Sequence, residues 1–338
     1  MKAAKYMGKE ELSIVDIPKP TPKEKEVLVK VKHTGICGTD LEAYKTGLYP
    51  VPVVMGHEIL GVVEEIGENV KKCKIGDRVT YNGSISCGQC PSCLRGDYNI
   101  CYDEFRELGI YKDGGFAEYV AIPTECLVAV PDSIPDKHGT IFEQLATGLQ
   151  SIRVAGVNMG DTAVIIGLGT IGQFILQGLK LAGVKKLIVI DKNPNRLEIA
   201  KKFNPDVALK KIAIGKIKGA TNRRGADYVF ECTGRPAVIN ASSSLIRKGG
   251  SLIQVGISDT PFNFNFLPFI MSQNRIQGIY AWHPRDFEFA IDLIARKMID
   301  PDPIVTNIIS IDDIVEKGFK EAIKPDTKEI KILVDPYK

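Results

Sequence analysis

The sequence has few of the features that would tie a protein to a membrane or to nucleic acid. No apolar run approaches the ~20 residues that a membrane-spanning helix needs. Residues 1–14 include lysines, but no apolar stretch follows them as it would in a secretory signal. The 44 basic and 41 acidic residues leave a formal charge of only +3, which gives no reason to expect an anionic partner. We therefore expect a cytoplasmic protein that binds neither nucleic acid nor a membrane.

The length and composition are those of a globular protein with more than one domain. The 338 residues suffice for two domains at roughly 100–200 residues each. A content of 44% hydrophobic and 25% charged residues is ordinary for such a protein. Cysteine is the exception, because four of the eight cysteines fall within residues 87–101. Since a reducing cytosol disfavours disulfides, the cluster indicates metal binding.

The pattern of apolar residues changes near Glu143. Before it, short runs separated by Gly, Pro and Asp predict β-strands at 27–31, 62–66, 115–121 and 127–130. After it, apolar runs alternate with helical stretches, with strands expected at 163–166, 186–190, 228–230 and 252–255 and helices at 171–181 and 195–203. Such alternation favours βαβ units and a parallel sheet.

Beyond residue 282 the pattern predicts a helix at 287–296 and a last strand at 330–334. The simplest organisation is an α/β domain inserted into a β-rich one. We expect the inserted domain, a doubly wound parallel sheet, over residues 149–281. The β-rich domain would then consist of residues 1–148 and 282–338.

The cysteine-rich loop spaces four thiols as C-x2-C-x2-C-x7-C, with the thiols at Cys87, Cys90, Cys93 and Cys101. Structural zinc takes four tetrahedral ligands, and thiolates supply them with no position left open. An iron–sulfur cluster also takes four cysteines, but its common spacing has three residues and then Pro around the fourth cysteine. Buried, unligated cysteines would not need this spacing. The loop 87–101 therefore predicts a structural zinc site.

Two further residues, Cys37 and His57, lie twenty positions apart, each beside glycine and each after an apolar run. A catalytic zinc site takes three protein ligands and leaves one position open, and these residues supply two. Either one alone would more often be a packed core residue. The third ligand is either Glu58 or the more distant Glu143, and the spacing does not choose between them.

A glycine-rich segment follows the apolar run 163–166 and opens a helical stretch, with the sequence Gly167-Leu-Gly169-Thr170-Ile171-Gly172. Asp191 ends the next apolar run, at the place where an acidic residue holds ribose hydroxyls. This is the context of the dinucleotide-binding (Rossmann) fingerprint, in which pyrophosphate lies on the helix N-terminus. Asp191 favours NAD, because a carboxylate repels a 2′-phosphate. Lys192 and Arg196 could reach a phosphate, so NADP stays possible.

Taken together, the motifs resemble those of the zinc-containing medium-chain alcohol dehydrogenase family in both content and order. The segments that carry the resemblance are Gly35–Asp40, Gly56–Glu58, Gly76–Val79, the cysteine loop, Asp113–Tyr119 and Gly167–Gly172. The resemblance is greatest to the branch of polyol (sorbitol-type), butanediol and threonine dehydrogenases. Glu143 stands where liver-type enzymes have a third cysteine ligand, and Glu231–Gly234 also fits that branch.

For the metal sites, the resemblance implies two zinc ions per chain and a β-rich catalytic domain of the GroES-like type. Cys37, His57 and Glu143 would hold the catalytic zinc, with Glu58 beside it and able to exchange with water or Glu143. Asp40 would orient His57, although its position fits a carboxylate at a helix start equally well.

For the substrate and cofactor, the resemblance assigns further roles. Thr39 would hydrogen-bond the alcohol and pass its proton on, and Arg196 would touch the adenosine ribose. Thr147 would pack behind the nicotinamide, and the strand end Val255-Gly256-Ile257 would hold its carboxamide. The family also implies a homo-oligomer, a tetramer rather than a dimer.

Two positions depart from the family pattern. Glu42 stands where many relatives have a histidine that relays a proton to solvent. Gln144 stands where relatives usually have proline after the glutamate ligand. Trp282 and His283 follow the predicted cofactor domain and are expected either to face the cleft between the domains or to lie on the surface.

The expected function is that of a zinc-dependent oxidoreductase. It would transfer a hydride from a secondary alcohol, polyol or related small hydroxylated substrate to NAD. A zinc-free quinone reductase shares the architecture but typically lacks the metal ligands, and a redox-sensing dinucleotide-binding protein needs no open zinc site. Cys37 together with His57 therefore favours the dehydrogenase. Polyols, sugars, 2,3-butanediol, other secondary alcohols and threonine are all compatible substrates.

Overall fold

The structure, a computed structural model, describes residues 1–83, 86–103, 107–258 and 260–338. The chain divides into two compact units. Unit 1 consists of Met1–Glu143 and Trp282–Lys338, and unit 2 consists of Gln144–Ala281. An α/β unit is thus inserted between two segments of a β-rich one, as the apolar pattern predicted.

In unit 1, the smaller sheet has the strand order β2-β1-β4. Its strands are β1 (Lys2–Gly8), β2 (Glu11–Asp16) and β4 (Val53–Val54). β1 pairs antiparallel with both neighbours. Tyr6 of β1 is fully buried and donates its hydroxyl to the carbonyl of Ala43, which ties this sheet to helix α1 (Gly38–Thr46).

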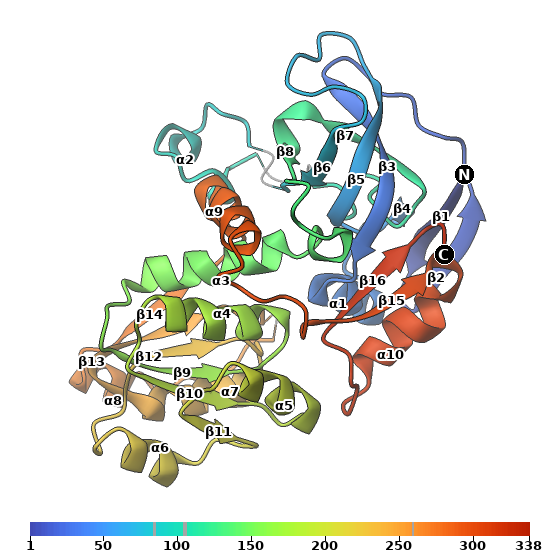
Figure 1. The fold of residues 1–338 in the computed structure, drawn as a ribbon. Helices are drawn as coiled ribbons and strands as arrows, with labels where there is room; N and C mark the ends of the chain where they lie inside the picture. Colours follow the sequence, from blue (N-terminus) through green and yellow to red (C-terminus); the bar gives the residue numbers. More distant parts are fainter. Residues whose placement is uncertain (84–85, 104–106, 259) are drawn as a thin grey trace. The chain divides into compact units, whose positions relative to one another are not determined.

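The larger sheet of unit 1 contains strands from both ends of the chain (Figure 1). Its strand order is β15-β16-β3-β5-β6-β8, and β7 pairs with β3. The strands are β3 (Glu26–Gly35), β5 (Glu58–Ile66), β6 (Arg78–Tyr81), β7 (Tyr119–Pro123), β8 (Leu127–Ala129), β15 (Val305–Ser310) and β16 (Lys331–Asp335). The last two come from the C-terminal segment, so residues about 300 positions apart share one sheet.

The strand expected at 115–121 begins later, because β7 spans Tyr119–Pro123. Residues 114–116 instead bond to the backbone of residues 54–56, through Gly114 N–H to Val54 O, Gly115 N–H to Gly56 O, and Phe116 N–H to Met55 O. This close approach needs glycine, since a Cβ on Gly114 would come within 2.2 Å of the Gly56 carbonyl oxygen. The expected start of the strand was therefore wrong for these residues.

The helices of unit 1 are short apart from two. They are α1, α2 (Pro91–Leu94), α9 (Pro284–Ala295) and α10 (Lys320–Ile323), preceded by a π-helical turn at Ile314–Phe319, with 3₁₀ turns at Tyr98–Ile100, Thr124–Cys126, Asp136–His138 and Ile311–Asp313. The helix expected at 287–296 is α9. It begins three residues earlier, because His283 accepts a hydrogen bond from Arg285 N–H as its cap and Pro284 occupies the first turn.

Unit 2 contains a six-stranded sheet in the order β11-β10-β9-β12-β13-β14, with every neighbouring pair parallel. The strands are β9 (Thr162–Ile166), β10 (Lys186–Ile190), β11 (Val207–Leu209), β12 (Ala226–Glu231), β13 (Ile246–Gln254) and β14 (Arg275–Gly278). The order reverses between β9 and β12, which is the topological switch point of a doubly wound sheet. The predicted parallel sheet is confirmed.

Helices cover both faces of this sheet. They are α3 (Phe142–Ala155), α4 (Thr170–Leu181), α5 (Pro194–Lys202), α6 (Ile214–Ala220), α7 (Pro236–Ser242) and α8 (Phe266–Met271). Side chains of β9 alternate between two cores: Ala163 and Ile165 pack with α4 and α5, whereas Val164 and Ile166 pack with α6, α7 and α8. Successive side chains of a strand point to opposite faces of the sheet. A strand that is buried on both faces must therefore be apolar throughout, as β9 is. Among the described residues, no helix is both long and apolar enough to cross a bilayer.

Candidate active site

The four cysteines of the loop 87–101 lie together. The sulfur of Cys93 is 3.4 Å from that of Cys90 and 3.9 Å from that of Cys87, and Cys90 and Cys101 are also 3.9 Å apart. Four sulfurs at about 2.3 Å from a tetrahedral zinc ion would be about 3.8 Å apart. None of the four is in a disulfide. The thiols therefore fit a structural zinc ion.

Backbone N–H groups already point at these sulfurs. Cys90 N–H donates to Cys87 Sγ at 3.3 Å, and Asp103 N–H donates to Cys101 Sγ at 3.4 Å. Donation from the backbone N–H groups of Tyr102 and Cys93 lowers the pKa of the Cys90 thiol to about 6. N–H groups aimed at sulfur stabilise thiolates, which are the form that binds metal.

A second cluster consists of Cys37, His57, Glu58 and Glu143. Each offers one ligand atom, and these four atoms all lie within 4.8 Å of one another. His57 Nε2 is 3.8 Å from Glu143 Oε1, and the Thr39 hydroxyl donates to Cys37 Sγ at 3.1 Å. Thiolate, imidazole and carboxylate are the ligands that zinc takes in proteins. The cluster therefore fits a metal ion, and it includes both carboxylates that the sequence left as alternatives.

Asp40 connects Cys37 with His57. Its Oδ2 accepts a hydrogen bond from Cys37 N–H at 3.0 Å, which caps the start of α1. Its Oδ1 faces His57 Nδ1 at 3.6 Å, and the Asp40 side chain is completely buried. One carboxylate is thus placed both at the helix start and opposite the imidazole, so the two expectations for Asp40 are not alternatives.

The second cluster concentrates acidic groups away from water. Burial raises the pKa of Glu143 to about 8 and that of Asp40 to about 6. Burial lowers the pKa of His57, but the facing anions Asp40, Glu143 and Cys37 raise it well above its ordinary value. The first two shifts report exclusion of water, and the raised pKa of His57 reports the anions that face it, which a bound cation would stabilise.

Lys331, the first residue of β16, belongs to this site and was not identified from the sequence. Its ammonium group donates to both carboxylate oxygens of Glu58 at 2.7 Å each and to the carbonyl of Ile36 at 2.7 Å. Burial lowers the pKa of Lys331, yet Glu58 and Cys37 raise it above its usual value. A single lysine before an apolar run carries no local signal of such a role.

In unit 2, the three glycines of the segment Gly167–Gly172 differ in backbone conformation and in the space around each Cα. Gly167 has a φ of +94°, and a Cβ on Gly172 would come within 2.0 Å of the Gly167 carbonyl oxygen. Gly169 has a φ of −68°, and a Cβ there would meet nothing within 4 Å. Packing within the described part of the chain therefore does not require glycine at position 169. No side chain caps this helix, so its first N–H groups can bind an anion.

Asp191 and Arg196 lie beside this loop. Asp191 Oδ2 accepts from Leu168 N–H at 2.7 Å, and Oδ1 accepts from Asn193 N–H at 2.8 Å. The carboxylate thus organises the loop as well as being available to ribose. Arg196 Nε is buried without a partner among the described residues, which leaves a donor for a bound group.

The segment Val255–Ile257, expected near the nicotinamide, closely approaches residues 231–234. A Cβ on Gly256 would lie 2.2 Å from Gly234 N, and a Cβ on Gly234 would lie 1.8 Å from the Ile257 carbonyl oxygen. Glu231 accepts hydrogen bonds from Gly234 N–H and Gln254 Nε2, which holds the two strand ends together. Ile257 is 70% exposed. Thr147 lies on α3 and is half-buried.

Four other positions were singled out from the sequence, and the structure shows the environment of each. Trp282 is buried and donates its indole N–H to Asn82 at 2.7 Å, and His283 caps α9. Glu42 is exposed and pairs with Lys45 at 3.3 Å. Gln144 is buried, and neither of its amide atoms has a partner among the described residues.

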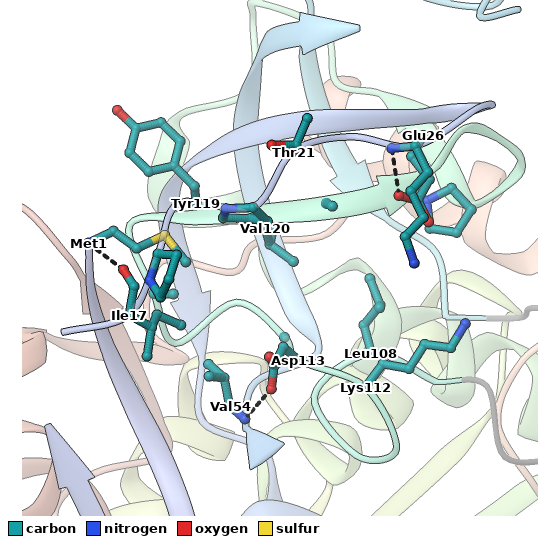
Figure 2. A pocket seen from close by; sticks show the side chains of 17 residues that line it. Met1, Ile17, Thr21, Glu26, Val54, Leu108, Lys112, Asp113, Tyr119 and Val120 are labelled. Atoms are coloured by element: carbon teal, nitrogen blue, oxygen red, sulfur yellow. Dashed lines mark hydrogen bonds between the residues drawn. The ribbon is translucent and has the colours of Figure 1, made fainter. Parts of the chain in front are cut away.

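A cavity of about 430 Å³ lies in unit 1, against the N-terminal strands (Figure 2). Its walls are mostly apolar, and its carboxylates are engaged in backbone contacts: Glu26 accepts from Lys23 N–H, and Asp113 accepts from Val54 N–H. None of the residues that line it belongs to either ligand cluster. The cavity is therefore separate from the candidate active site.

Comparison with known proteins agrees with this geometry. Residues 23–132 match the family model "Alcohol dehydrogenase GroES-like domain", and residues 170–296 match "Zinc-binding dehydrogenase". A sorbitol dehydrogenase from Halalkalibacterium halodurans is 35% identical over 337 residues, covering 97% of each chain.

Solved structures are also similar to this chain, and the two named here match over 99% of both chains. They include 2R,3R-butanediol dehydrogenase from Bacillus subtilis, with a TM-score of 0.88 and 29% identity. Another is a structure from Escherichia coli CFT073 described as a short chain alcohol dehydrogenase complexed with the cofactor NADH, with a TM-score of 0.91 and 27% identity.

Proposed function

The chain belongs to the zinc-containing medium-chain alcohol dehydrogenase family, and we propose that this member oxidises a secondary alcohol or polyol with NAD. The observation that carries the proposal is the convergence of Cys37, His57 and Glu143 in unit 1. A zinc-free quinone reductase or a sensor has no need of this set. A dehydrogenase that acts on CH–OH groups does.

We assign the catalytic zinc to Cys37, His57 and Glu143, and the structural zinc to the four cysteines of the loop 87–101. Zinc bound at the first set would act as a Lewis acid that lowers the pKa of the substrate hydroxyl. Asp40 keeps the imidazole directed toward the ligand cluster. Thr39 reaches Cys37 Sγ through its hydroxyl, so a small rotation would let it accept the alcohol proton instead.

For the cofactor, we propose that pyrophosphate lies on the N-terminus of α4, over Gly169. NAD then supplies the hydride acceptor. Asp191 would bind the ribose hydroxyls through the lone pairs that its two backbone contacts leave, with Arg196 against the adenosine ribose. Thr147 and Val255–Ile257 would hold the nicotinamide ring and its carboxamide. Glu42, exposed and paired with Lys45, offers no imidazole relay, so the proton would leave by water or cofactor ribose.

A dehydrogenase assay tests this function directly. Purified enzyme should reduce NAD with at least one of sorbitol, xylitol, 2,3-butanediol, a simple secondary alcohol or threonine. A chelator should abolish the activity, and added zinc should restore it. The matched control is the same panel with the chelated enzyme. Absence of NAD and NADP reduction across the whole panel, in enzyme carrying about two zinc ions per chain, would contradict the proposal.

We also propose a homo-oligomer, with a tetramer favoured, that forms through the β14 edge of unit 2. All four residues of β14 are exposed, and Ile276 at this edge is 44% exposed. On α8, Ile270 and Met271 are 68% and 73% exposed. An open strand edge beside exposed apolar side chains favours pairing with another chain.

Replacing Ile276 with lysine is expected to lower the assembled mass, because a charged side chain on an edge strand opposes pairing. Light scattering coupled to gel filtration measures the mass, and a Met7→Lys variant on exposed surface of unit 1 (43% exposed) serves as the control. A wild-type protein that is monomeric throughout the micromolar range would refute the assembly.

A further inference from the structure

Glu231, the last residue of β12, is a fully buried carboxylate whose two oxygens each accept two hydrogen bonds. Oε1 accepts from the hydroxyl of Thr233 and, at 2.8 Å, from its N–H group. Oε2 accepts from Gly234 N–H at 2.9 Å and from Gln254 Nε2 at 2.7 Å. All four donors are uncharged, so hydrogen bonds stabilise this carboxylate without an opposite charge.

The chemistry of these contacts requires an acid at position 231. An ionised carboxylate accepts hydrogen bonds at both oxygens, whereas a side-chain amide of the same size accepts at only one. Glutamine at this position would therefore turn an NH2 group toward two other donors. Burying a carboxylate costs free energy that an apolar residue filling the same space would not cost. A glutamate here therefore indicates that the neighbouring backbone must be held in place.

Both the backbone and the side chain of Glu231 contact the segment that follows β13. The Glu231 carbonyl accepts from Val255 N–H and Gly256 N–H at 2.8 Å each. Gln254, which is bonded to the carboxylate, also donates from Nε2 to the Gly256 carbonyl at 2.7 Å. One glutamate therefore sets the conformation in which residues 255–257 leave the sheet.

This carboxylate lies where three strand ends meet. The N–H of Cys232 donates to the Ile166 carbonyl, at the end of β9, at 2.8 Å. A Cβ on Gly167 would lie 2.7 Å from Thr233 Cγ2, so the glycine-rich loop also packs against the turn that follows β12. A doubly wound sheet binds its ligand at such a switch point, at the carboxyl ends of the strands. Ile257 is 70% exposed, which leaves the segment after β13 open to a ligand.

We propose that Glu231 is a positioning residue that holds residues 255–257 in the conformation that binds the carboxamide of the nicotinamide ring. This inference rests on the proposed function, which supplies the cofactor. The protein itself fills the acceptor sites of the carboxylate, so Glu231 acts through residues 255–257 and does not touch the cofactor. The pyrophosphate and the adenosine would bind instead at the N-terminus of α4 and at Asp191. Loss of the Glu231 carboxylate should therefore weaken the hold on only one end of the cofactor.

The test is Glu231→Gln, with the binding of NADH compared with that of ADP-ribose by isothermal titration calorimetry. ADP-ribose carries the adenosine and the pyrophosphate but lacks the nicotinamide ring. We expect the affinity for NADH to fall by about tenfold or more, because buried donors lose their acceptor and residues 255–257 are released. The affinity for ADP-ribose should stay near that of the wild type. Equal losses for the two ligands, or no loss for either, would overturn the inference.

Two further variants separate positioning from general damage to the domain. Asp191→Asn changes the adenosine end, so it should alter the binding of NADH and of ADP-ribose by the same factor. Gln254→Met keeps the carboxylate but removes the donor that links it to the Gly256 carbonyl. It should weaken NADH selectively, although less than Glu231→Gln does. If Glu231→Gln does not fold, Gln254→Met decides alone, and equal losses or no loss would overturn the inference.

Hydrogen exchange tests the same role without any cofactor. In the cofactor-free protein, the amides that bond to Glu231, at positions 233, 234, 255 and 256, should exchange faster in Glu231→Gln than in the wild type. The amides of β9 and β10 should be unchanged and serve as the internal control. Unchanged exchange at all four positions would overturn the inference. Failure of the proposed function would instead appear as a wild type that binds neither NADH nor NADPH, with the exchange result unaffected.

Discussion

Replacing Glu143 with alanine is expected to lower zinc retention at the catalytic site and turnover together. The reason is that a carboxylate ligand contributes both charge and geometry to a metal site, and Glu143 Oε1 lies 3.8 Å from His57 Nε2 within the cluster. The four cysteines of the structural site are untouched. Metal analysis after dialysis should therefore show about one zinc ion per chain, against about two in the wild type.

The matched control is Thr39→Val, which removes a hydroxyl and leaves every candidate ligand in place. Its zinc content should stay near wild type, although the hydrogen bond from Thr39 to Cys37 Sγ is lost. Its turnover should fall by about 10²–10⁴-fold, the usual contribution of a positioned proton-transfer group. Neither residue belongs to the glycine-rich loop, so NADH binding measured by fluorescence should survive both changes.

Zinc content after identical dialysis decides between the possible third ligands. Greater loss in the Glu143 variant than in the Thr39 variant assigns the ligand to Glu143. Equal retention in the two would exclude Glu143 as a ligand and give the position to Glu58 or water.

The features that could be predicted from the sequence are those formed by residues that lie close together in the chain. Four cysteines within residues 87–101 are brought together by the turns of one loop, without pairing between distant segments. The glycines at 167–172 serve a single turn between a strand and a helix, and the structure places Gly167 at positive φ, where glycine is needed. The parallel sheet of unit 2 was predictable for the same reason, because each strand and helix carries its own apolar pattern.

Lys331 could not be found in this way. Its contact with Glu58 joins residues 273 positions apart, and it forms only because β16 and β5 both pair with β3. A lysine at the start of an apolar strand is far more typical of a solvated strand edge than of a buried ion pair. Register across three strands, rather than residue type, brings its charge to the metal cluster.

Sequence also left Glu58 and Glu143 as alternatives, and the structure adds a physical distinction between them. Both lie in the cluster, but the Glu58 carboxylate is fully buried against Lys331, whereas the Glu143 side chain is 15% exposed in the first turn of α3. Local pattern cannot supply such a difference, since it depends on which distant charge each carboxylate meets. The difference between the two carboxylates therefore follows from tertiary contacts.

Removing the charge of Asp191 is expected to shift cofactor use from NAD toward NADP. A carboxylate about 4 Å from a phosphate is repelled by about 1–4 kcal/mol per charge at a protein surface. We therefore expect the ratio of kcat/KM for NAD to that for NADP to fall by about tenfold or more in Asp191→Asn. Lys192 and Arg196 would then be free to attract the 2′-phosphate. Steady-state kinetics with both cofactors measures the ratio.

At position 191, asparagine removes the charge with little other change, whereas alanine also removes the hydrogen bonds to the backbone. Asparagine is therefore the main test, and alanine is the comparison. Asp191 accepts from Leu168 N–H and Asn193 N–H, and alanine would leave both buried donors unpaired, at about 1–3 kcal/mol each. Asparagine has the same size and keeps one acceptor oxygen, so less of this loss is expected. If repulsion sets cofactor choice, both variants improve relative NADP use, and only alanine weakens binding of both cofactors strongly. A wild type that already prefers NADP severalfold would show that Asp191 does not select NAD.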